Sequence, residues 1–402
     1  MAIRKNGINR ELYPIEGGVC APNGFSANAI HAGFSSNSDK LDLAFVVSDK
    51  RCPAAAVFSN NAVVGAPVTV SKRHLKYGLS YGVLINSGIA NVFQKDGEEL
   101  AEKASQLAAN SIIVDRADIL IASTGKIGPK LQLKTFEDAI KPLSKGLQST
   151  HENSLLAAQA IMTTDRTVKQ LSYRFEIGDF SCKIGAIFKG SQRVSPNMAT
   201  TLGVITTDVN ISSDMLQRAF LSAVNNVLNL LDIDGVSSPN DMFCILANGR
   251  AGNFKIQQMD CEYEKFCYIL KEFMLRVCKE IAKDGENGKV LLCHVRGAKS
   301  KQVARKLAKN LSISMGLKKL IARNEIDVET IICALTDVDV EDDFSQLYMH
   351  IKSAKGKFVI CEDAQTINFS KDLMATFLDE PEVELFIDLR KGNFGVTSIS
   401  GV

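Results

Sequence analysis

The 402 residues are enough for two domain-sized halves or one large intertwined fold. A net charge of +2 provides no basic field for nucleic acid, and 46% hydrophobic with 23% charged residues is ordinary for a globular protein. No uninterrupted apolar run approaches the ~20 residues that a membrane-spanning helix needs, and residues 1–7 contain no apolar signal-peptide core. We therefore expect a cytoplasmic protein that binds neither nucleic acid nor a membrane.

Cysteine and histidine show no metal-binding pattern. The ten cysteines contain no C-x-x-C pair, and the five histidines contain no H-x-x-x-H spacing. Most cysteines stand in apolar runs, such as Cys244 between Phe243 and Ile245. This is typical of reduced thiols in a core, so we expect neither a metal nor a cofactor.

The first half of the chain alternates predicted strands with polar turns. Strands are predicted over 41–47, 54–59 and 63–71. A further buried strand, 81–85, leads into the polar loop 86–91, which exposes backbone amides or is a simple turn. Apolar residues at helical spacing, with acidic residues near the N-terminus, predict a helix over 96–109.

A short predicted strand over 118–122 ends in Ser123-Thr124-Gly125. A threonine followed by glycine at a strand end can present a hydroxyl and a backbone amide to an oxyanion. As an isolated motif this is weak, because glycine ends strands in many proteins. The G-x-x-x-x-G-K-[ST] pattern of a phosphate loop is absent from the sequence.

Two further elements lead to the middle of the chain. A predicted helix over 154–162 ends in a Met-Thr-Thr-Asp sequence at 162–165. Residues 171–187 predict a hairpin that turns at Gly178 and delivers Lys189 to the central run 189–208.

The second half continues the mixture of strands and helices. Strands are predicted over 202–209, 290–295, 331–335, 358–361 and 385–389, and helices from Ser212 or Ser213 through Leu231, over 263–282 and over 300–312. The sequence therefore predicts a mixed α/β fold, with sheets covered by helices and no internal repeat.

The central run joins a polar, turn-forming segment to a strand at Ala199 and Thr200. A self-cleaving enzyme with an N-terminal nucleophile would place its scissile bond at such a joint. The threonine hydroxyl attacks its own preceding carbonyl, and hydrolysis then frees an amine that serves as the general base for that hydroxyl. From the pattern alone, a loop leading into a buried strand is the simpler interpretation.

The central run also carries a resemblance. It reads Lys189-Gly190-Ser191, then Pro196-Asn197-Met198-Ala199-Thr200, then Leu202-Gly203 and Ile205-Thr206-Thr207-Asp208. This resembles the signature of the ornithine acetyltransferases, also called bifunctional glutamate N-acetyltransferases. Four other parts of the chain agree with that family, at 86–91, 123–128, 162–165 and 234–241, as does Asp284-Gly285-Glu286. The resemblance covers essentially the whole chain.

The resemblance implies self-cleavage between Ala199 and Thr200, with an α chain 1–199 and a β chain 200–402. Thr200 would be the nucleophile and the acetyl carrier, and Thr124 and Gly125 would form the oxyanion hole. Substrate contacts would come from Thr163, Lys189, Thr200 and Glu286. We choose Thr163 over Thr164 by its spacing to Lys189.

The implied activity belongs to arginine biosynthesis and follows a ping-pong course. N2-acetylornithine acetylates Thr200, ornithine leaves, and glutamate takes the acetyl group. Members of the family can also use acetyl-CoA as a co-substrate. The implied fold is the autoprocessing type shared with D-aminopeptidase-like enzymes, and the α and β chains would assemble as heterotetramers or larger oligomers.

Three departures from the family pattern leave alternatives open. Gln192 and Arg193 replace a Gly-Met pair, the region 317–332 lacks a D-x-N-W-G-R-like segment, and 395–402 lacks an Asn-Ala…Arg tail that closes the site. A more open site would suit an autoprocessing amidohydrolase or aminopeptidase on the same fold. A non-catalytic paralogue with a structural role is the third interpretation.

Overall fold

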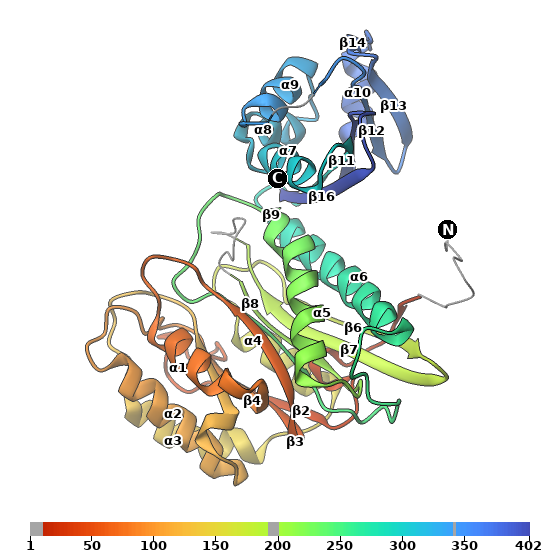
Figure 1. The fold of residues 1–402 in the computed structure, drawn as a ribbon. Helices are drawn as coiled ribbons and strands as arrows, with labels where there is room; N and C mark the ends of the chain where they lie inside the picture. Colours follow the sequence, from red (N-terminus) through yellow and green to blue (C-terminus); the bar gives the residue numbers. More distant parts are fainter. Residues whose placement is uncertain (1–10, 192–200, 341–342) are drawn as a thin grey trace. The chain divides into compact units, whose positions relative to one another are not determined.

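The computed structural model describes residues 11–191, 201–340 and 343–402, which fold into two compact units (Figure 1). The first unit contains 11–190, 201–224 and 237–274, and the second contains Ser191, 225–236 and the described part of 275–402. The chain thus leaves the first unit and returns to it. The predicted division into 1–199 and 200–402 follows a proposed cut rather than these units, and it stays a prediction.

A mixed sheet dominates the first unit. Its strands run in the order β1-β6-β7-β8-β10-β3-β4-β5, and β2 pairs with β3. The antiparallel β6 and β7 confirm the predicted hairpin over 171–187. Because β8 pairs with β7 on one side and β10 on the other, strands from before and after the central run share this sheet. The strands are β1 (Tyr13–Pro14), β2 (Phe25–Ile30), β3 (Leu43–Phe58), β4 (Leu79–Asn86), β5 (Ile119–Ser123), β6 (Gln170–Ile177), β7 (Phe180–Lys189), β8 (Leu202–Thr207) and β10 (Met242–Ala247).

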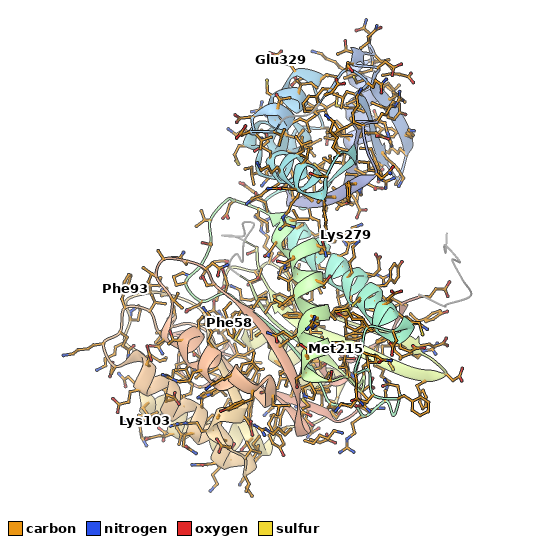
Figure 2. The ribbon with its side chains drawn as sticks, in the orientation of Figure 1. Phe58, Phe93, Lys103, Met215, Lys279 and Glu329 are labelled. Carbon is orange, nitrogen blue, oxygen red and sulfur yellow. The ribbon has the colours of Figure 1, made fainter. Side chains whose placement is uncertain are left out.

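Helices cover both faces of this sheet, because neighbouring residues of a strand point to opposite faces. On β3, Ala44 and Val46 share a core with α4, whereas Leu43 and Phe45 share a core with α2 and α3. Side chains fill the space between the layers (Figure 2). The helices are α1 (Ala66–His74), α2 (Gly97–Ile112), α3 (Leu133–Lys145), α4 (His151–Ala160) and the beginnings of α5 (Ser213–Asn226) and α6 (Cys261–Lys283), with 3-10 turns at Gly18–Cys20, Leu75–Tyr77 and Arg116–Asp118.

The predicted strand over 63–71 is wrong, because α1 begins at Ala66. Pro67 stands in the first turn of this helix, where its missing amide donor costs nothing. Val68 and Val70, whose β-branched side chains suggested a strand, are buried. Burial of this helix face therefore outweighs the β propensity of its residues.

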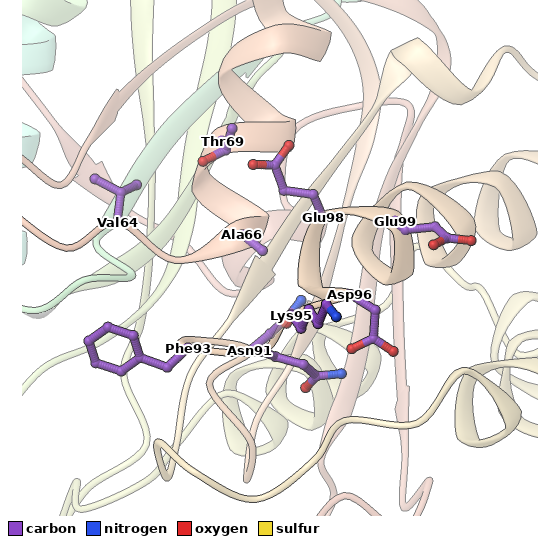
Figure 3. A pocket seen from close by; sticks show the side chains of 10 residues that line it. Val64, Ala66, Thr69, Asn91, Phe93, Lys95, Asp96, Glu98 and Glu99 are labelled. Atoms are coloured by element: carbon purple, nitrogen blue, oxygen red, sulfur yellow. The ribbon is translucent and has the colours of Figure 1, made fainter.

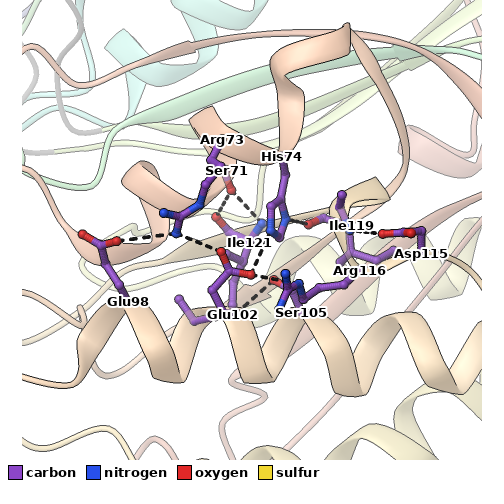
Figure 4. A network of polar contacts seen from close by, with 12 residues as sticks. Ser71, Arg73, His74, Glu98, Glu102, Ser105, Asp115, Arg116, Ile119 and Ile121 are labelled. Atoms are coloured by element: carbon purple, nitrogen blue, oxygen red, sulfur yellow. Dashed lines mark hydrogen bonds and ion pairs between the residues drawn. The ribbon is translucent and has the colours of Figure 1, made fainter.

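A polar network fastens α1 and α2 to β5 (Figure 4). The Glu102 carboxylate lies 2.8 Å from an Arg73 nitrogen, 3.1 Å from His74 Nε2 and 3.0 Å from Arg116 Nε. His74 Nδ1 lies 2.8 Å from the carbonyl oxygen of Ile119, the first residue of β5. The network thereby fixes the strand whose end enters the predicted Thr-Gly loop.

The second unit contains a mixed sheet in the order β14-β13-β12-β15-β11-β16-β9. Leu307 and Leu311 of α7 share a core with Leu291 and Cys293 of β11. Its strands are β9 (Leu231–Asp232), β11 (Val290–Ala298), β12 (Tyr348–Ser353), β13 (Gly356–Glu362), β14 (Gln365–Thr366), β15 (Glu382–Asp388) and β16 (Phe394–Gly401). Its helices are α7 (Lys301–Ile313), α8 (Met315–Ala322), α9 (Val328–Thr336) and α10 (Lys371–Leu378), with a 3-10 turn at Leu228–Leu230.

The predicted strand over 331–335 is also wrong, because these residues belong to α9. Asp327 caps this helix by accepting a hydrogen bond of 2.7 Å from the Thr330 amide. A short apolar run cannot by itself distinguish a buried helix from a strand. The N-terminal cap at Asp327 therefore indicated the helix, whereas the apolar run 331–335 did not.

Three properties of the described residues bear on function classes. None of the described helices is long and apolar enough to cross a membrane. Within the described ranges, no group of three or more His, Cys, Asp or Glu side chains could hold a metal ion. All ten cysteines are free thiols, and most of them are buried.

Candidate active site

Two loops meet where β4 and β5 end. These strands are parallel and pair Asn86 with Ser123, so the following loops leave the same edge of the sheet. Ser123 Oγ donates to Asn86 Oδ1 at 2.5 Å, and the Thr124 amide donates to the Asn86 carbonyl at 2.9 Å. The Lys126 amide then donates to the Gly88 carbonyl at 2.9 Å. The loop 86–91 and the Thr-Gly loop therefore form one hydrogen-bonded structure.

Gly125 is required at this junction. Its φ of +126° lies in a region that favours glycine, and a Cβ there would stand 2.3 Å from the carbonyl carbon of Gly88. In the part of the chain that the structure describes, neither the Thr124 hydroxyl nor the Gly125 amide has a hydrogen-bond partner. The two groups can therefore donate to an anionic oxygen of a ligand.

A second polar group surrounds Lys189, the last residue of β7. The side chain of Lys189 is 6% exposed, and its Nζ donates to Thr163 Oγ1 at 2.5 Å. The Asp165 carboxylate lies 3.8 Å from this Nζ and 2.9 Å from Lys169 Nζ. It also accepts hydrogen bonds from the amides of Thr163 at 3.0 Å and Gly190 at 2.7 Å.

Burial and charge oppose each other in this group. Burial raises the pKa of Asp165, but Lys189, Lys169 and the two amides lower that pKa to below its ordinary value. Burial lowers the pKa of Lys189, and the Asp165 carboxylate counteracts this effect. The result is a buried lysine beside a hydroxyl, and the protonated form of this lysine is a suitable partner for the carboxylate of a ligand.

Asp241 fixes the chain at the start of β8. Its Oδ1 accepts from the Thr201 amide at 2.9 Å, and the Met242 amide donates to the Thr201 carbonyl at 3.1 Å. Burial raises the pKa of Asp241 well above its ordinary value, against the hydrogen bonds from Ser238 and Thr201, which lower it. The backbone of Thr201, which follows the predicted nucleophile, is therefore anchored in the core.

The predicted cleavage residues Ala199 and Thr200 lie outside the described residues, as do Gln192 and Arg193. Glu286 belongs to the second unit, where it is exposed on the turn between α6 and β11. The structure thus brings Thr163 to Lys189, and it brings the Thr124–Gly125 pair to the loop 86–91.

Two surface cavities are lined mainly by other residues. One of about 310 Å³ lies at the start of α2, where Asn91, Phe93 and Glu98 contribute to its lining (Figure 3). The other, of about 960 Å³, is lined by residues of α7, α8 and α9 and by their connecting segments. No predicted site residue lines either cavity, so cavity volume alone does not identify the site.

Sequence reasoning assigned no role to Asp165, Lys169 or Asp241. A signal for Asp165 was present, because it ends the segment 162–165 that agrees with the family. Asp241 ends the segment 234–241 that agrees with the family, but no local signal indicated its contact with Thr201, which is 40 residues away along the chain.

A family model and similar sequences both indicate one family. The model described as the ArgJ family matches residues 26–400. The arginine biosynthesis bifunctional protein ArgJ of Staphylococcus epidermidis is 33% identical over 382 residues, which cover 94% of each chain. The protein of that name from Caldanaerobacter subterraneus subsp. tengcongensis is 33% identical over 390 residues, covering 96% of this chain and 95% of its own. Among solved structures, ArgJ of Bacillus halodurans is 28% identical with a TM-score of 0.44, covering 46% of this chain and 97% of its own.

Proposed function

The chain belongs to the ArgJ family and is an acyltransferase of arginine biosynthesis, and from this premise we propose how it carries out acetyl transfer. The donor is N2-acetylornithine, the acceptor is glutamate, and Thr200 carries the acetyl group between them. The observation that carries the proposal is the family match over 26–400, which includes the whole central run.

The first half-reaction acylates Thr200. Its hydroxyl oxygen attacks the acetyl carbonyl of N2-acetylornithine, the free amine of Thr200 takes the hydroxyl proton, and the amide bond to ornithine breaks as its nitrogen is protonated. The Thr124 hydroxyl and the Gly125 amide donate to the tetrahedral oxyanion, and each such donor contributes roughly 3–4 kcal/mol. Their lack of other partners among the described residues supports this role.

The second half-reaction returns the acetyl group to an amine. The glutamate nitrogen attacks the Thr200 ester, and the hydroxyl is regenerated. Because an amide is broken in the first half-reaction and an amide is formed in the second, the transfer is close to thermoneutral. The enzyme therefore mainly has to exclude water from the ester.

Substrate contacts follow from charge. We assign the substrate carboxylate to Lys189 and Thr163, whose Nζ and Oγ1 already lie 2.5 Å apart in a buried setting. We assign the ammonium group of a substrate to Glu286, an exposed carboxylate. Acetyl-CoA is a further proposed acetyl donor.

The proposal includes self-cleavage between Ala199 and Thr200. A cut there would not separate the fragments, because β7 and β8 remain paired from Ile184–Thr207 to Lys189–Leu202. The sheet would hold an α chain 1–199 and a β chain 200–402 together. We propose that two or more such αβ pairs assemble.

The test combines cleavage with turnover of labelled substrate. Wild-type protein should give two bands on a denaturing gel and a fragment with N-terminal Thr200, and it should convert acetyl-labelled N2-acetylornithine and glutamate to N-acetylglutamate. Thr200→Ala should remain uncut and inactive. Free acetate without N-acetylglutamate would instead favour the amidohydrolase, and two bands from Thr200→Ala would exclude Thr200 as the cleaving residue.

A further inference from the structure

We propose that Asp165 is a positioning residue of the acetyl-transfer site, a role that rests on the proposed function. Its carboxylate gathers four partners from two segments of the chain. Oδ1 accepts from the Gly190 amide at 2.7 Å and from Lys169 Nζ at 2.9 Å. Oδ2 accepts from the Thr163 amide at 3.0 Å and lies 3.8 Å from Lys189 Nζ.

These contacts couple two groups that are distant along the chain. Thr163 and Lys189 are 26 residues apart, and Lys189 reaches Thr163 with a flexible side chain. Asp165 fixes the backbone on both sides of that contact, at Thr163 and at Gly190. Without it, the lysine and the hydroxyl would each have to be ordered when the substrate binds, which weakens binding.

Asp165 also acts on the charge of Lys189. Among the described residues, the charged groups that act electrostatically on Lys189 are Asp165, Lys169, Asp241 and Lys40. Asp165 is the carboxylate that forms an ion pair with it, at 3.8 Å. Burial and the two lysines lower the pKa of Lys189, whereas the two carboxylates raise it. Asp165 therefore favours the protonated form of Lys189, which is the form that binds a substrate carboxylate.

Asp165→Asn tests whether the charge of Asp165 acts on Lys189 or whether Asp165 only supports the loop. Asparagine has nearly the same shape and retains one acceptor oxygen, but it removes the charge and replaces the second acceptor by an NH2 donor. We expect the KM for N2-acetylornithine to rise and kcat/KM to fall by roughly 10–100-fold. The alkaline limb of kcat/KM should move to lower pH by about one unit, because the protonated form of Lys189 loses its counter-charge.

Asp208→Asn is the matched control. Asp208 is a buried carboxylate of the same unit that accepts from the amides of Lys183 at 2.7 Å and Asn23 at 3.1 Å. Loss of this carboxylate should lower thermal stability. The KM of the cleaved enzyme and the alkaline limb of its kcat/KM profile should both stay at their wild-type values. An alkaline limb that does not move in cleaved Asp165→Asn would overturn the proposal, because a purely structural aspartate would not set the charge of Lys189.

Asp165→Glu keeps the proposal testable if the asparagine variant does not fold. It keeps the charge but displaces it by one methylene group, so KM should rise while the alkaline limb stays in place. A KM equal to that of the wild type, measured on cleaved Asp165→Glu protein, would count against a positioning role. Wild-type enzyme that makes no N-acetylglutamate would instead refute the proposed function itself.

Discussion

Each unit buries a lysine beside an aspartate, and the two pairs differ in the other groups that they contact. In the first unit, the Asp165 side chain is fully buried and contacts two lysines and two backbone amides, all in or beside loops. In the second unit, Asp232 at the end of β9 pairs with Lys318 of α8, whose Nζ also donates to the Ile233 carbonyl at 2.8 Å. One arrangement converges on a predicted substrate contact, whereas the other ties a strand to a helix.

The protonation behaviour of the two aspartates differs accordingly. The pKa of Asp165 is below its ordinary value, because its several partners outweigh burial. Burial raises the pKa of Asp232, against the single cation Lys318, and Asp232 Oδ1 is buried without a hydrogen-bond partner among the described residues. The same two residue types thus form a fully satisfied charged site in one unit and a minimal structural pair in the other.

The largest expected effect is on the loop junction of the first unit. In Gly125→Ala, the new Cβ would collide with the backbone of Gly88 at 2.3 Å and displace the amide proposed to stabilise the oxyanion. Loss of such a donor lowers kcat by about 100–1,000-fold. Steady-state kinetics on the cleaved protein measures this effect.

Gly128→Ala is the control for this variant. Gly128 also has a positive φ, of +111°, but a Cβ there would have nothing within 4 Å. It should therefore lose only the roughly 1 kcal/mol that an unfavourable backbone conformation costs, with little change in kcat. Equal losses of activity in the two variants would mean that backbone strain, rather than the contact with Gly88, explains the result.

The next largest effect is expected from the structural pair of the second unit. Lys318→Met would leave the Asp232 carboxylate buried without its cation, which costs roughly 3–5 kcal/mol of unfolding free energy. Asp232→Asn combined with Lys318→Met should recover much of that loss. Urea unfolding at matched protein concentration measures both.

The exposed ion pair Lys352–Glu384 is the control for this experiment. Lys352 is 51% exposed and lies 2.6 Å from Glu384, so Lys352→Met should change the unfolding free energy by less than about 1 kcal/mol. Similar losses for the exposed and the buried lysine would contradict the contrast between the two pairs.

The sequence predicted long, strongly patterned elements better than short apolar ones. The hairpin at 171–187 and the helix at 263–282 are present as β6–β7 and α6, because the turn and the amphipathic period stand in the local sequence. The strands predicted at 63–71 and 331–335 are helices, because Val68 and Ile331 satisfy a buried helix face as well as a strand.

The candidate site divides in a similar way. Motifs indicated Thr124, Gly125, Thr163 and Lys189, but not that Gly125 must lie against Gly88 or that Asp165 fastens Thr163 to Gly190. Such contacts join segments that only the folded sheet brings together, so no local pattern encodes them.

The smallest expected effect concerns acid stability in the second unit. His350 of β12 stacks on Phe386 with ring centroids 4.5 Å apart, and its Nδ1 is buried without a partner among the described residues. Burial, together with Lys357, Arg296 and His294, lowers its pKa from 6.5 to about 4, and Glu384 opposes this shift. Between those pH values, the unfolded chain binds a proton that the folded chain does not, so stability falls as the pH falls through this window.

Partial exposure of the ring screens this contribution, so we expect it to reach only about 1–2 kcal/mol at the acid end. His350→Gln should flatten the pH dependence of urea unfolding between those two values by that amount. His294→Gln should retain the dependence, because His294 already has hydrogen-bond partners in Glu384 at 2.9 Å and Thr397 at 2.8 Å. A wild-type slope in His350→Gln would assign the acid sensitivity to other groups.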